Sequence, residues 1–375
     1  MKNPLKNSQG MALVVIIFVG AILLTLTGAS LLFSSLDLKA TSALKDGTIA
    51  LQVADTGIHH ALAVIPAGTT FNYSTDPNNP TCVIPSSSCS SAQYDFGGGY
   101  SYTVTAINTA GNTQAILTST AFGPNGTKKV VVAYVGRGNY GLGAVSMPGS
   151  PADKTETGFS GDSFTINGND SCNAAPATPG IVVTDSALAT EITNNTTTDG
   201  GLEPGQMDNV IGAGGSPSVV TVPALSQSVS EMAQAYLNVP DHPPTVLEGG
   251  NFSSNDTWGT SSSPRITRIT GNTQIQGTVE GYGVLIVEGA LDVSGNFTFH
   301  GLVIARGDIQ VQFTGNAGVY GSLIVGESTT LDSNLELDVR GSATVRYDSC
   351  ALAAPNSWVP LPKAAKLVAW QEKLT

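Results

Sequence analysis

The most constraining feature of this 375-residue sequence is an apolar stretch near its start, Met11–Phe33, which contains no charged residue and no proline. A helix over this stretch rises about 1.5 Å per residue, so it reaches roughly 34 Å and crosses a hydrocarbon core of about 30 Å. Lys2 and Lys6 precede the stretch, and the first acidic residue, Asp37, follows it. Because a basic flank stays in the cytoplasm, we expect the chain from Asp37 onward to be exported.

The helix is predicted to continue well beyond the apolar stretch. A secretory signal peptide has an apolar region of about 7–15 residues and then a small-residue cleavage site, whereas here no proline interrupts the chain until Pro66. Gly47 and Gly57 each weaken a helix by about 1 kcal/mol. We nevertheless predict one helix over residues 11–65, apolar all round in its first half and amphipathic in its second. The apolar face of the second half is expected to contain Leu44, Leu51, Ala54, Ile58, Ala61, Leu62 and Ile65.

The N-terminal residues resemble a known family. A short basic leader ends at Gln9-Gly10, and Met11-Ala12-Leu13-Val14 begins the apolar stretch at once. Near the end of the predicted helix, the chain is similar to an A-x-Q-x-A-E-x-G pattern, with aspartate in place of the usual glutamate. These positions are Ala50, Gln52, Ala54, Asp55 and Gly57. Over about residues 1–65 the chain therefore resembles the PilX-type minor pilins of the type IV pilin superfamily.

This resemblance implies processing and partners. It implies cleavage between Gly10 and Met11 by a prepilin peptidase, which leaves Met11 as a methylated N-terminus. The implied partners are other major and minor pilins, met through the N-terminal helix, together with the prepilin peptidase and the inner-membrane assembly machinery. The implied location is the inner membrane, as a single-pass protein with a cytoplasmic N-terminus, and afterwards the extracellular pilus.

One position departs from the major pilins. They carry glutamate at the fifth mature position, which is Val15 here; in the family that carboxylate is thought to neutralise the terminal amine of the subunit ahead, since a charge in lipid is costly unless it is paired. A subunit without the glutamate suits the tip of a filament or an initiating complex. The alternative is that Val15 only reflects a minor-pilin or pseudopilin lineage.

Composition limits what the exported part can bind. The net charge of −12 becomes −14 once the leader with Lys2 and Lys6 is removed, and only 12% of the residues are charged. So acidic a chain is not expected to bind nucleic acid through its overall field. The part after the predicted helix, about 310 residues, is long enough for more than one core.

The four cysteines fit an oxidising compartment. Cys82 and Cys89 bracket a short loop, whereas Cys172 and Cys350 are far apart in the sequence. Four cysteines allow three connectivities, of which we favour Cys82–Cys89 with Cys172–Cys350. Free buried thiols and a metal site are alternatives, but closely spaced cysteine pairs and a nearby histidine are missing.

Two kinds of sequence pattern follow the helix. Three segments separated by turns predict a small antiparallel sheet that covers the amphipathic part of the helix: Tyr100–Ile107, Thr113–Thr120 and Lys128–Val135. Further on, a glycine is repeatedly followed by a short aliphatic run. The copies are Gly283-VLIV, Gly301-LVIA, Gly321-SLIV and Gly341-SATVRY, 18 to 20 residues apart. Such periods predict the turns of a β-solenoid, with earlier turns at 160–170 and 179–190.

The predicted fold class is α+β, with a long N-terminal transmembrane and amphipathic helix, a small antiparallel pilin-like sheet and a large β-solenoid domain. The expected divisions are a leader (1–10), the helix (11–65, of which 11–33 is transmembrane), the sheet (66–136), the solenoid with insertions (137–350) and a C-terminal tail (351–375). Leu225, Val229, Met232 and Tyr236 predict one short helix inside the solenoid. The helix-like tail, including Trp370-Gln371-Glu372, is expected to cover a solenoid end.

We expect no enzymatic activity and no cofactor. A polysaccharide lyase groove on a β-helix needs clustered carboxylates for Ca²⁺ and an Arg or Lys base. The residues that fit those roles are Glu288, Arg306, Asp308, Glu327 and Arg340, which also suit solvated turns. His59 and His60 lie on the helix, and His300 is alone on a glycine-rich turn. A structural calcium at Asp162, Asn167, Asn169 and Asp170 is the alternative to ordinary turn-forming roles for these residues.

Three functions are therefore considered. The first is a minor pilin that initiates or caps a type IV pilus and presents its solenoid for adhesion. The second is the tip pseudopilin of a type II secretion system, although such proteins usually carry a helical insertion rather than a β-rich one. The third is a membrane-anchored carbohydrate-binding or lyase β-helix.

Overall fold

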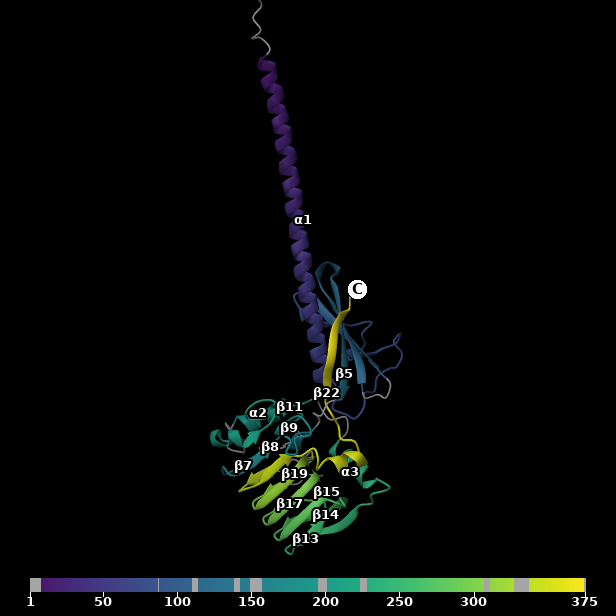
Figure 1. Cartoon of the computed structure of the whole chain (residues 1–375), viewed down its shortest axis with the longest axis vertical. Coiled ribbons are helices and arrows are strands. Elements are labelled where there is room, and N and C mark those ends of the chain that lie inside the picture. Colours follow the sequence, from purple (N-terminus) through teal and green to yellow (C-terminus); the bar gives the residue numbers. More distant parts are fainter. Residues whose placement is uncertain are drawn as a thin grey trace, which may run out of the picture.

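The computed structural model describes residues 8–86, 88–109, 114–137, 142–148, 157–194, 201–222, 228–306, 311–326 and 337–373. It has the predicted α+β class: a long helix, an antiparallel sheet packed on the second half of that helix, and a β-solenoid (Figure 1). The solenoid lies beyond the C-terminal end of the helix, at the opposite end of the molecule from the N-terminus.

The N-terminal helix α1 runs from Ser8 to Val64 without interruption, close to the predicted bounds. Its end is set by Pro66, because proline lacks the N–H that would continue the helix and disfavours helical geometry in the residue before it. The buried stripe on its second half contains Ala50, Val53, Ala54, Gly57, Ile58, Ala61 and Ile65. Of the predicted stripe, Ala54, Ile58, Ala61 and Ile65 are buried, and Leu51 and Leu62 are partly buried against the same core. The prediction is wrong at Leu44, which is 74% exposed because the sheet does not reach it.

The antiparallel sheet has the order β1-β3-β4-β5-β22, with β2 also paired to β3. The strands are β1 (Thr81–Ile84), β2 (Tyr94–Gly97), β3 (Tyr100–Asn108), β4 (Gln114–Phe122), β5 (Lys128–Arg137) and β22 (Ala365–Lys373), with a short 3-10 turn, η2, at Pro124–Gly126. Alternate residues of the central strands are buried against α1, among them Val104, Leu117 and Val131. One residue of the predicted second strand, Thr113, lies outside the described residues.

The C-terminal tail corrects a sequence-based expectation. Its last segment is not a helix over a solenoid end but strand β22, which pairs antiparallel with β5 from Ala365↔Arg137 to Lys373↔Val130. The chain thus returns to the helix-bound sheet after completing the solenoid, and the sheet extends beyond the predicted boundary at residue 136. Lys129 Nζ lies 2.6 Å from Glu372 Oε1 across this pair of strands.

The solenoid is a coil of parallel strands with three sides. The long strands bend at a corner and belong to two sides: β12 (Thr245–Phe252), β14 (Arg265–Ile275), β15 (Thr278–Val287), β17 (Asn296–Ala305) and β19 (Asn316–Val325). The first side holds the runs 265–269, 283–287, 301–305 and 321–325, together with β6 (Val145–Met147), β9 (Ile181–Val183) and β11 (Val219–Thr221).

Shorter strands complete the other two sides. The second side contains β16 (Leu291–Val293), β18 (Val311–Phe313), β20 (Leu337–Arg340) and β7 (Thr157–Ser160). The third side contains β13 (Asp256–Trp258), the first halves of β15, β17 and β19, then β21 (Thr344–Tyr347), β8 (Thr165–Asn167) and β10 (Val210–Ile211). Three short helical elements, α2 (Ser186–Thr193), η4 (Pro204–Asn209) and α4 (Ala353–Trp358), join or cover these strands.

The turns do not stack in sequence order. The first turn along the chain, β6-β7-β8, pairs with the last, formed by the end of β19, β20 and β21. After β8 the chain adds β9 and β11 at one end of the solenoid, where α2 packs. It then crosses to the opposite end and begins the next turns with β12, which pairs with β14. The region 160–170 therefore supplies turn strands as predicted, but they stack on the end of the repeat rather than before its beginning. The region 179–190 supplies only the strand β9 before α2 begins.

The unbroken aliphatic runs have a structural reason. In β15 every residue from Gly283 to Val287 is buried, and the same holds for Gly301–Ala305 and Gly321–Val325. Continuous rather than alternating apolar residues are needed when both faces of a strand are covered. The solenoid core lies on one face, while the short predicted helix, α3 (Val229–Leu237), packs against β14 and α4 packs against β15 and β17.

The repeated glycines form the corner between the third and first sides. Gly283, Gly301 and Gly321 pair with one another in successive turns, and their φ angles are +115°, +138° and +145°. A Cβ atom on Gly301 would collide with the carbonyl oxygen of Gly283, and one on Gly321 with that of Gly301. Both the backbone conformation and the close stacking of turns therefore require glycine at this corner.

Candidate functional site

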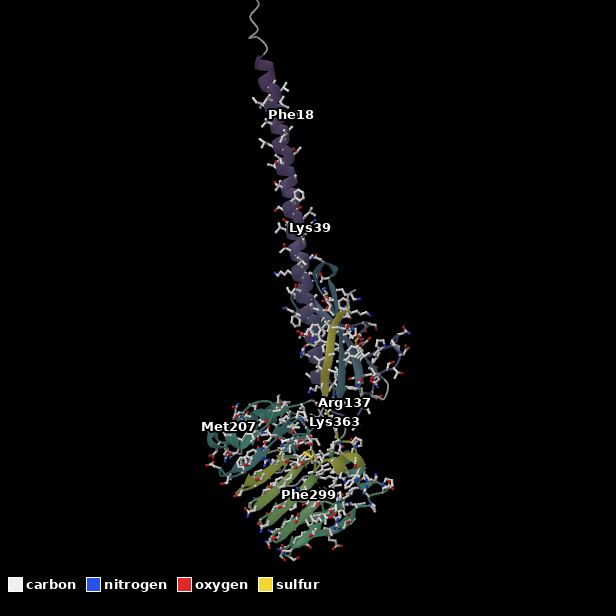
Figure 2. All side chains as sticks on the ribbon, viewed as in Figure 1. Phe18, Lys39, Arg137, Met207, Phe299 and Lys363 are labelled. Atoms are coloured by element: carbon white, nitrogen blue, oxygen red, sulfur yellow. A yellow bond between two sulfur atoms is a disulfide. The ribbon has the colours of Figure 1, made fainter. Side chains whose placement is uncertain are left out.

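The most unusual surface of the molecule is the first half of α1. Its described apolar side chains project away from the remainder of the protein, as Phe18 does in Figure 2, and the apolar window of this helix has no buried residue. The exposed large side chains are Leu13, Val14, Val15, Ile16, Ile17, Phe18, Val19, Ile22, Leu23, Leu24, Leu26, Leu31, Phe33, Leu36, Leu38 and Leu44. Burying one such side chain is worth about 1.5–3 kcal/mol, so this surface is suited to lipid or to apolar partners.

The helix is long and apolar enough to cross a membrane. Gly10 and Met11, the positions of the expected cleavage, lie near the start of α1, whose described backbone begins at Ser8. Val15 is 55% exposed within the projecting half. A valine there leaves the apolar surface unbroken by charge, which suits packing in lipid or among similar helices.

The second half of α1 shows why its small residues are needed. Ala50, Ala54 and Ala61 are fully buried against the sheet. A Cβ atom on Gly57 would collide with Ser119 Oγ and come within 2.9 Å of Tyr102, so glycine allows the helix to approach β3 and β4 closely. Among the residues that carry the family resemblance, Ala50, Ala54 and Gly57 thus face the sheet.

The other two positions of the family pattern, Gln52 and Asp55, lie at the surface. Gln52 is exposed, and Asp55 Oδ2 lies 3.7 Å from His59 Nδ1, one turn further on and largely exposed. His60 Nδ1 lies 2.6 Å from Tyr102 Oη, and its ring packs edge-on against Tyr94. The two helix histidines therefore have local packing and surface partners.

A junction connects the helix-bound sheet to the solenoid. Arg137, the last residue of β5, donates hydrogen bonds to the carbonyl oxygens of Pro66, Thr70 and Lys363 at 2.6, 2.9 and 3.1 Å. Its guanidinium carbon also lies 4.1 Å above the ring of Phe71. The labels of Arg137 and Lys363 in Figure 2 mark this point, where the outgoing and returning chains run side by side. Burial lowers the pKa of Arg137, in part offset by Tyr73.

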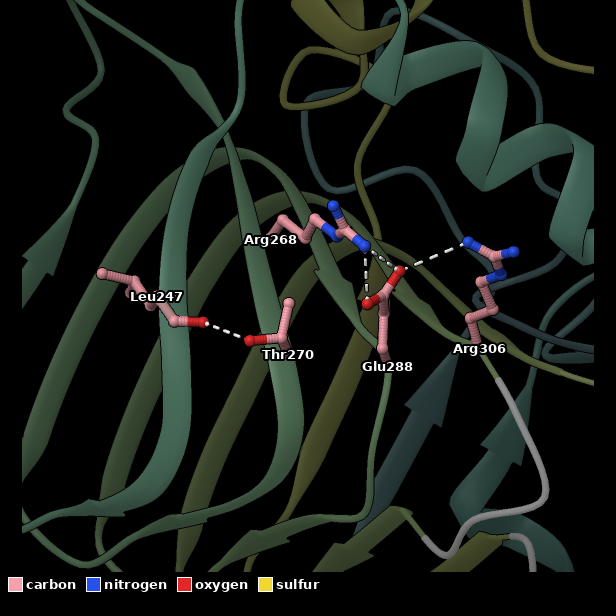
Figure 3. Close-up of polar contacts among 5 residues, drawn as sticks. All are labelled: Leu247, Arg268, Thr270, Glu288 and Arg306. Carbon is pink, nitrogen blue, oxygen red and sulfur yellow. Dashed lines mark hydrogen bonds and ion pairs between the residues drawn. The ribbon is translucent and has the colours of Figure 1, made fainter.

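Two of the charged residues considered for catalysis, Glu288 and Arg306, belong to a bridge between turns. Arg268 Nη2 donates to both oxygens of Glu288 at 2.9 Å, and Arg306 Nη1 lies 3.3 Å from Glu288 Oε1 (Figure 3). Thr270 Oγ1 donates to the carbonyl oxygen of Leu247 at 3.3 Å in the next turn. Successive turns are thus tied together along this corner, and both oxygens of Glu288 are engaged by arginine.

The other candidate lyase residues lie elsewhere. Arg340 forms its ion pair with Asp338 on β20, at 2.6 Å, rather than with Glu288. Asp308 and Glu327 lie outside the described residues. Within the part of the chain that the structure describes, Glu288 and Arg306 are therefore brought together, but as members of an ion-pair network with Arg268.

The calcium candidates also have local roles. The carboxylate of Asp170 accepts hydrogen bonds from the backbone N–H groups of Ala174, Ala175 and Ser349 and from the Ser349 hydroxyl, at 2.7 to 2.8 Å. Burial raises the pKa of Asp170, but these hydrogen bonds outweigh that effect, and the pKa lies below its usual value. Asn167 Oδ1 accepts from the N–H of Asn169, as in an ordinary Asx turn.

The cysteines form two disulfides. Cys82 is bonded to Cys89, with Cα atoms 5.5 Å apart, and Cys172 is bonded to Cys350, with Cα atoms 6.1 Å apart. The second bond joins the loop after β8 to the segment that follows β21. Because β8 and β21 are paired strands, this disulfide fastens the first turn of the solenoid along the chain to the last.

A row of stacked rings was missed by the sequence analysis. His300 is not alone on a turn: its ring lies 4.6 Å from that of Tyr282 and 5.0 Å from that of Tyr320, with interplanar angles of 11° and 14°. The segment 280–283, which holds Tyr282, is part of strand β15. A signal was present, because each of these rings immediately precedes a glycine of the repeat.

Comparisons with known protein families, curated proteins and solved structures find no match to this chain.

Proposed function

We propose that this protein is a minor pilin of a type IV pilus, anchored in the inner membrane before assembly and then incorporated through α1 into the filament. The observation that carries the proposal is the division of one continuous helix into an apolar half without intramolecular cover and a second half docked on an antiparallel sheet. A membrane holds the first half before assembly, and neighbouring helices of the same kind cover it afterwards. The resemblance of residues 1–65 to PilX-type minor pilins supports the same proposal.

The position of the solenoid favours the tip of the filament. The solenoid lies beyond the C-terminal end of α1 (Figure 1). If the helices of a filament all point the same way, a subunit ahead of this one would need that space. Val15 supplies no carboxylate for the N-terminal amine of a subunit ahead. Both features suit a subunit that initiates or caps the filament and presents its solenoid outward.

The polar clusters support a role without catalysis. Glu288 is neutralised by two arginines, and the Asp170 carboxylate is engaged by four donors. A general base or a Ca²⁺ ligand directs its oxygen atoms at a substrate or an ion, whereas these two carboxylates are directed at structural partners. We therefore propose that the solenoid displays a surface rather than performs a reaction.

Processing at Gly10 tests the assignment to the pilin superfamily. The Gly10→Val variant, produced in the native host, is expected to keep residues 1–10, whereas the wild-type protein should begin at a methylated Met11 when its N-terminus is analysed by mass spectrometry. Gly20→Ala is the matched control, because a Cβ atom at Gly20 meets nothing within 4 Å, and it should be processed normally. Normal maturation of the Gly10 variant would refute the proposal.

The type of assembly needs a separate measurement. Deleting the gene should reduce surface pili while leaving protein secretion unchanged, and a gold label on the protein should appear at filament tips in electron micrographs. The reverse pattern, with lost secretion and normal pili, would assign the protein to a type II secretion system instead.

A further inference from the structure

A groove runs beside the glycine corner of the solenoid. Its volume is about 250 Å³, and its lining includes Ser261, Pro264, Tyr282, Gly283, His300 and Asp348. The stacked glycines carry no side chain, so the corner leaves room between the row of rings on the third side and the segment 348–354 that packs over the first side. The volume lies below the roughly 300–1,000 Å³ of pockets for drug-sized ligands, which restricts the groove to a small molecule or one ring of a larger one.

One wall of the groove is aromatic and held in place. Tyr282 and His300 stack with their centroids 4.6 Å apart, and Tyr320 continues the stack on the next turn. Tyr282 Oη donates a hydrogen bond to Glu280 Oε1 at 2.9 Å, which fixes its ring on the surface of β15. A rigid aromatic side chain with a polar tip offers apolar contact and hydrogen bonding at small entropic cost.

The opposite wall offers hydrogen-bond acceptors. Asp348 Oδ2 accepts from Ser171 Oγ at 2.6 Å and Oδ1 from the N–H of Ala351 at 2.8 Å, and each oxygen keeps a further lone pair. Burial lowers the pKa of His300, partly opposed by Asp348 and Glu280, so the neutral ring has one donor and one acceptor nitrogen near pH 7. No lysine or arginine is among the residues known to line the groove.

We propose that this groove binds a single neutral or amino-bearing sugar ring. The C–H face of a pyranose packs on the face of Tyr282 that His300 does not cover. Its hydroxyl groups donate to Asp348 and exchange hydrogen bonds with the edge of His300, and Ser261 completes the rim. Anionic sugars and phosphates are disfavoured, because the charged residue on the groove lining is the carboxylate Asp348. The inference deepens the proposed function, since it gives the displayed solenoid a class of ligand, but its test requires no filament.

The test uses the purified full-length protein in nanodiscs of phosphatidylcholine, because maltoside or glucoside detergents would themselves offer sugars. Saturation-transfer NMR with methyl glucoside, methyl galactoside, N-acetylglucosamine, glucosamine and glucuronate should give signals for at least one neutral or amino sugar and none for glucuronate. Equal signals for glucuronate, or silence for every sugar, would overturn the proposal.

Two variants assign any binding to the groove. Tyr282→Ala removes the aromatic wall, and Ser261→Trp fills the groove from an exposed position without touching the core. Each should weaken binding by about tenfold or more. Tyr134→Ala, at an exposed tyrosine on the distant antiparallel sheet, is the control and should bind like the wild type. If Ser261→Trp folds with an unchanged thermal midpoint and still binds, the sugar lies elsewhere and the inference is wrong.

Discussion

At the scale of single residues, the solenoid repeat could be predicted because the backbone geometry of its corner accepts only glycine. Gly283, Gly301 and Gly321 recur because each has a positive φ and touches the backbone of the turn beneath. The rings beside them were not recognised as a row, since one sequence does not show that positions 18 to 20 residues apart stack on each other. The ion-pair bridge of Glu288 was misjudged for a similar reason, because its partner Arg268 comes from another turn.

The glycine corner predicts a large effect of a single methyl group. Gly301→Ala should lower the free energy of unfolding by about 2–4 kcal/mol, since it combines a strained φ with a collision against the Gly283 carbonyl oxygen. Gly161→Ala is the matched control in the same domain: its φ is +80°, but a Cβ atom there meets nothing within 4 Å. Thermal unfolding should show a much smaller loss for Gly161→Ala, and equal losses would contradict the stacking argument.

Asp170 predicts how stability depends on acid. Its pKa is lowered in the folded protein, so its stabilising contribution is complete above the unfolded value near 3.8 and is lost as the pH falls below it. The thermal midpoint should therefore drop between about pH 5 and pH 2 more steeply in the wild type than in Asp170→Asn. Parallel pH profiles for the two proteins would show that this carboxylate does not contribute.

At the scale of elements, local pattern predicted most of the structure. The helix over residues 11–65, three strands of the antiparallel sheet and the solenoid repeat all follow from periodicities of 3.6 and 2 and from the 18- to 20-residue repeat. Strand β22 was missed because AKLVAWQEKL is rich in residues that favour helices, such as Ala, Lys, Leu and Glu. The free edge of β5 decides its structure instead, by pairing along its full length.

The docking of α1 predicts opposite effects for two glycines of the same helix. Gly57→Ala should destabilise the protein by about 1–3 kcal/mol, because the gain in helix propensity is outweighed by overpacking against Ser119 and Tyr102. Gly47→Ala should be neutral or stabilising by up to about 1 kcal/mol, since its nearest neighbour, Lys129 Cε, is 3.8 Å away. Chemical denaturation of both variants measures the sign, and a stabilised Gly57→Ala would contradict the close approach of helix and sheet.

At the scale of the whole molecule, the order in which the turns stack was beyond sequence reasoning. Strand pairing between residues 145 and 323 depends on contacts across most of the domain, and nothing local distinguishes that order from stacking along the chain. The sequence likewise predicted the short helix α3, but not that this helix lies in the connection that crosses the solenoid from β11 to β12.

The molecule should tolerate loss of its projecting helix. Removing residues 1–44 should give a water-soluble protein whose thermal midpoint is close to that of the full chain, because residues 41–45 are exposed and Asp46 is the first residue of α1 described as hydrogen-bonded to the sheet. Removing residues 1–57 is the comparison, since it deletes buried Ala50, Val53 and Ala54 and should expose the sheet and cause aggregation. Circular dichroism and size-exclusion chromatography distinguish the two, and an unfolded shorter truncation would mean that the exposed half stabilises the fold.

The pairing of the first turn of the solenoid with the last affects how the number of turns can change in evolution. Both covalent links to the helix-bound sheet leave from adjacent levels midway along the coil, beside the Cys172–Cys350 bond. Neither end of the solenoid is connected directly to the helix-bound sheet. Turns can therefore be duplicated or lost at both ends while those connections stay unchanged. The length and the exposed area of the coil can therefore vary independently of the helix and the sheet packed on it.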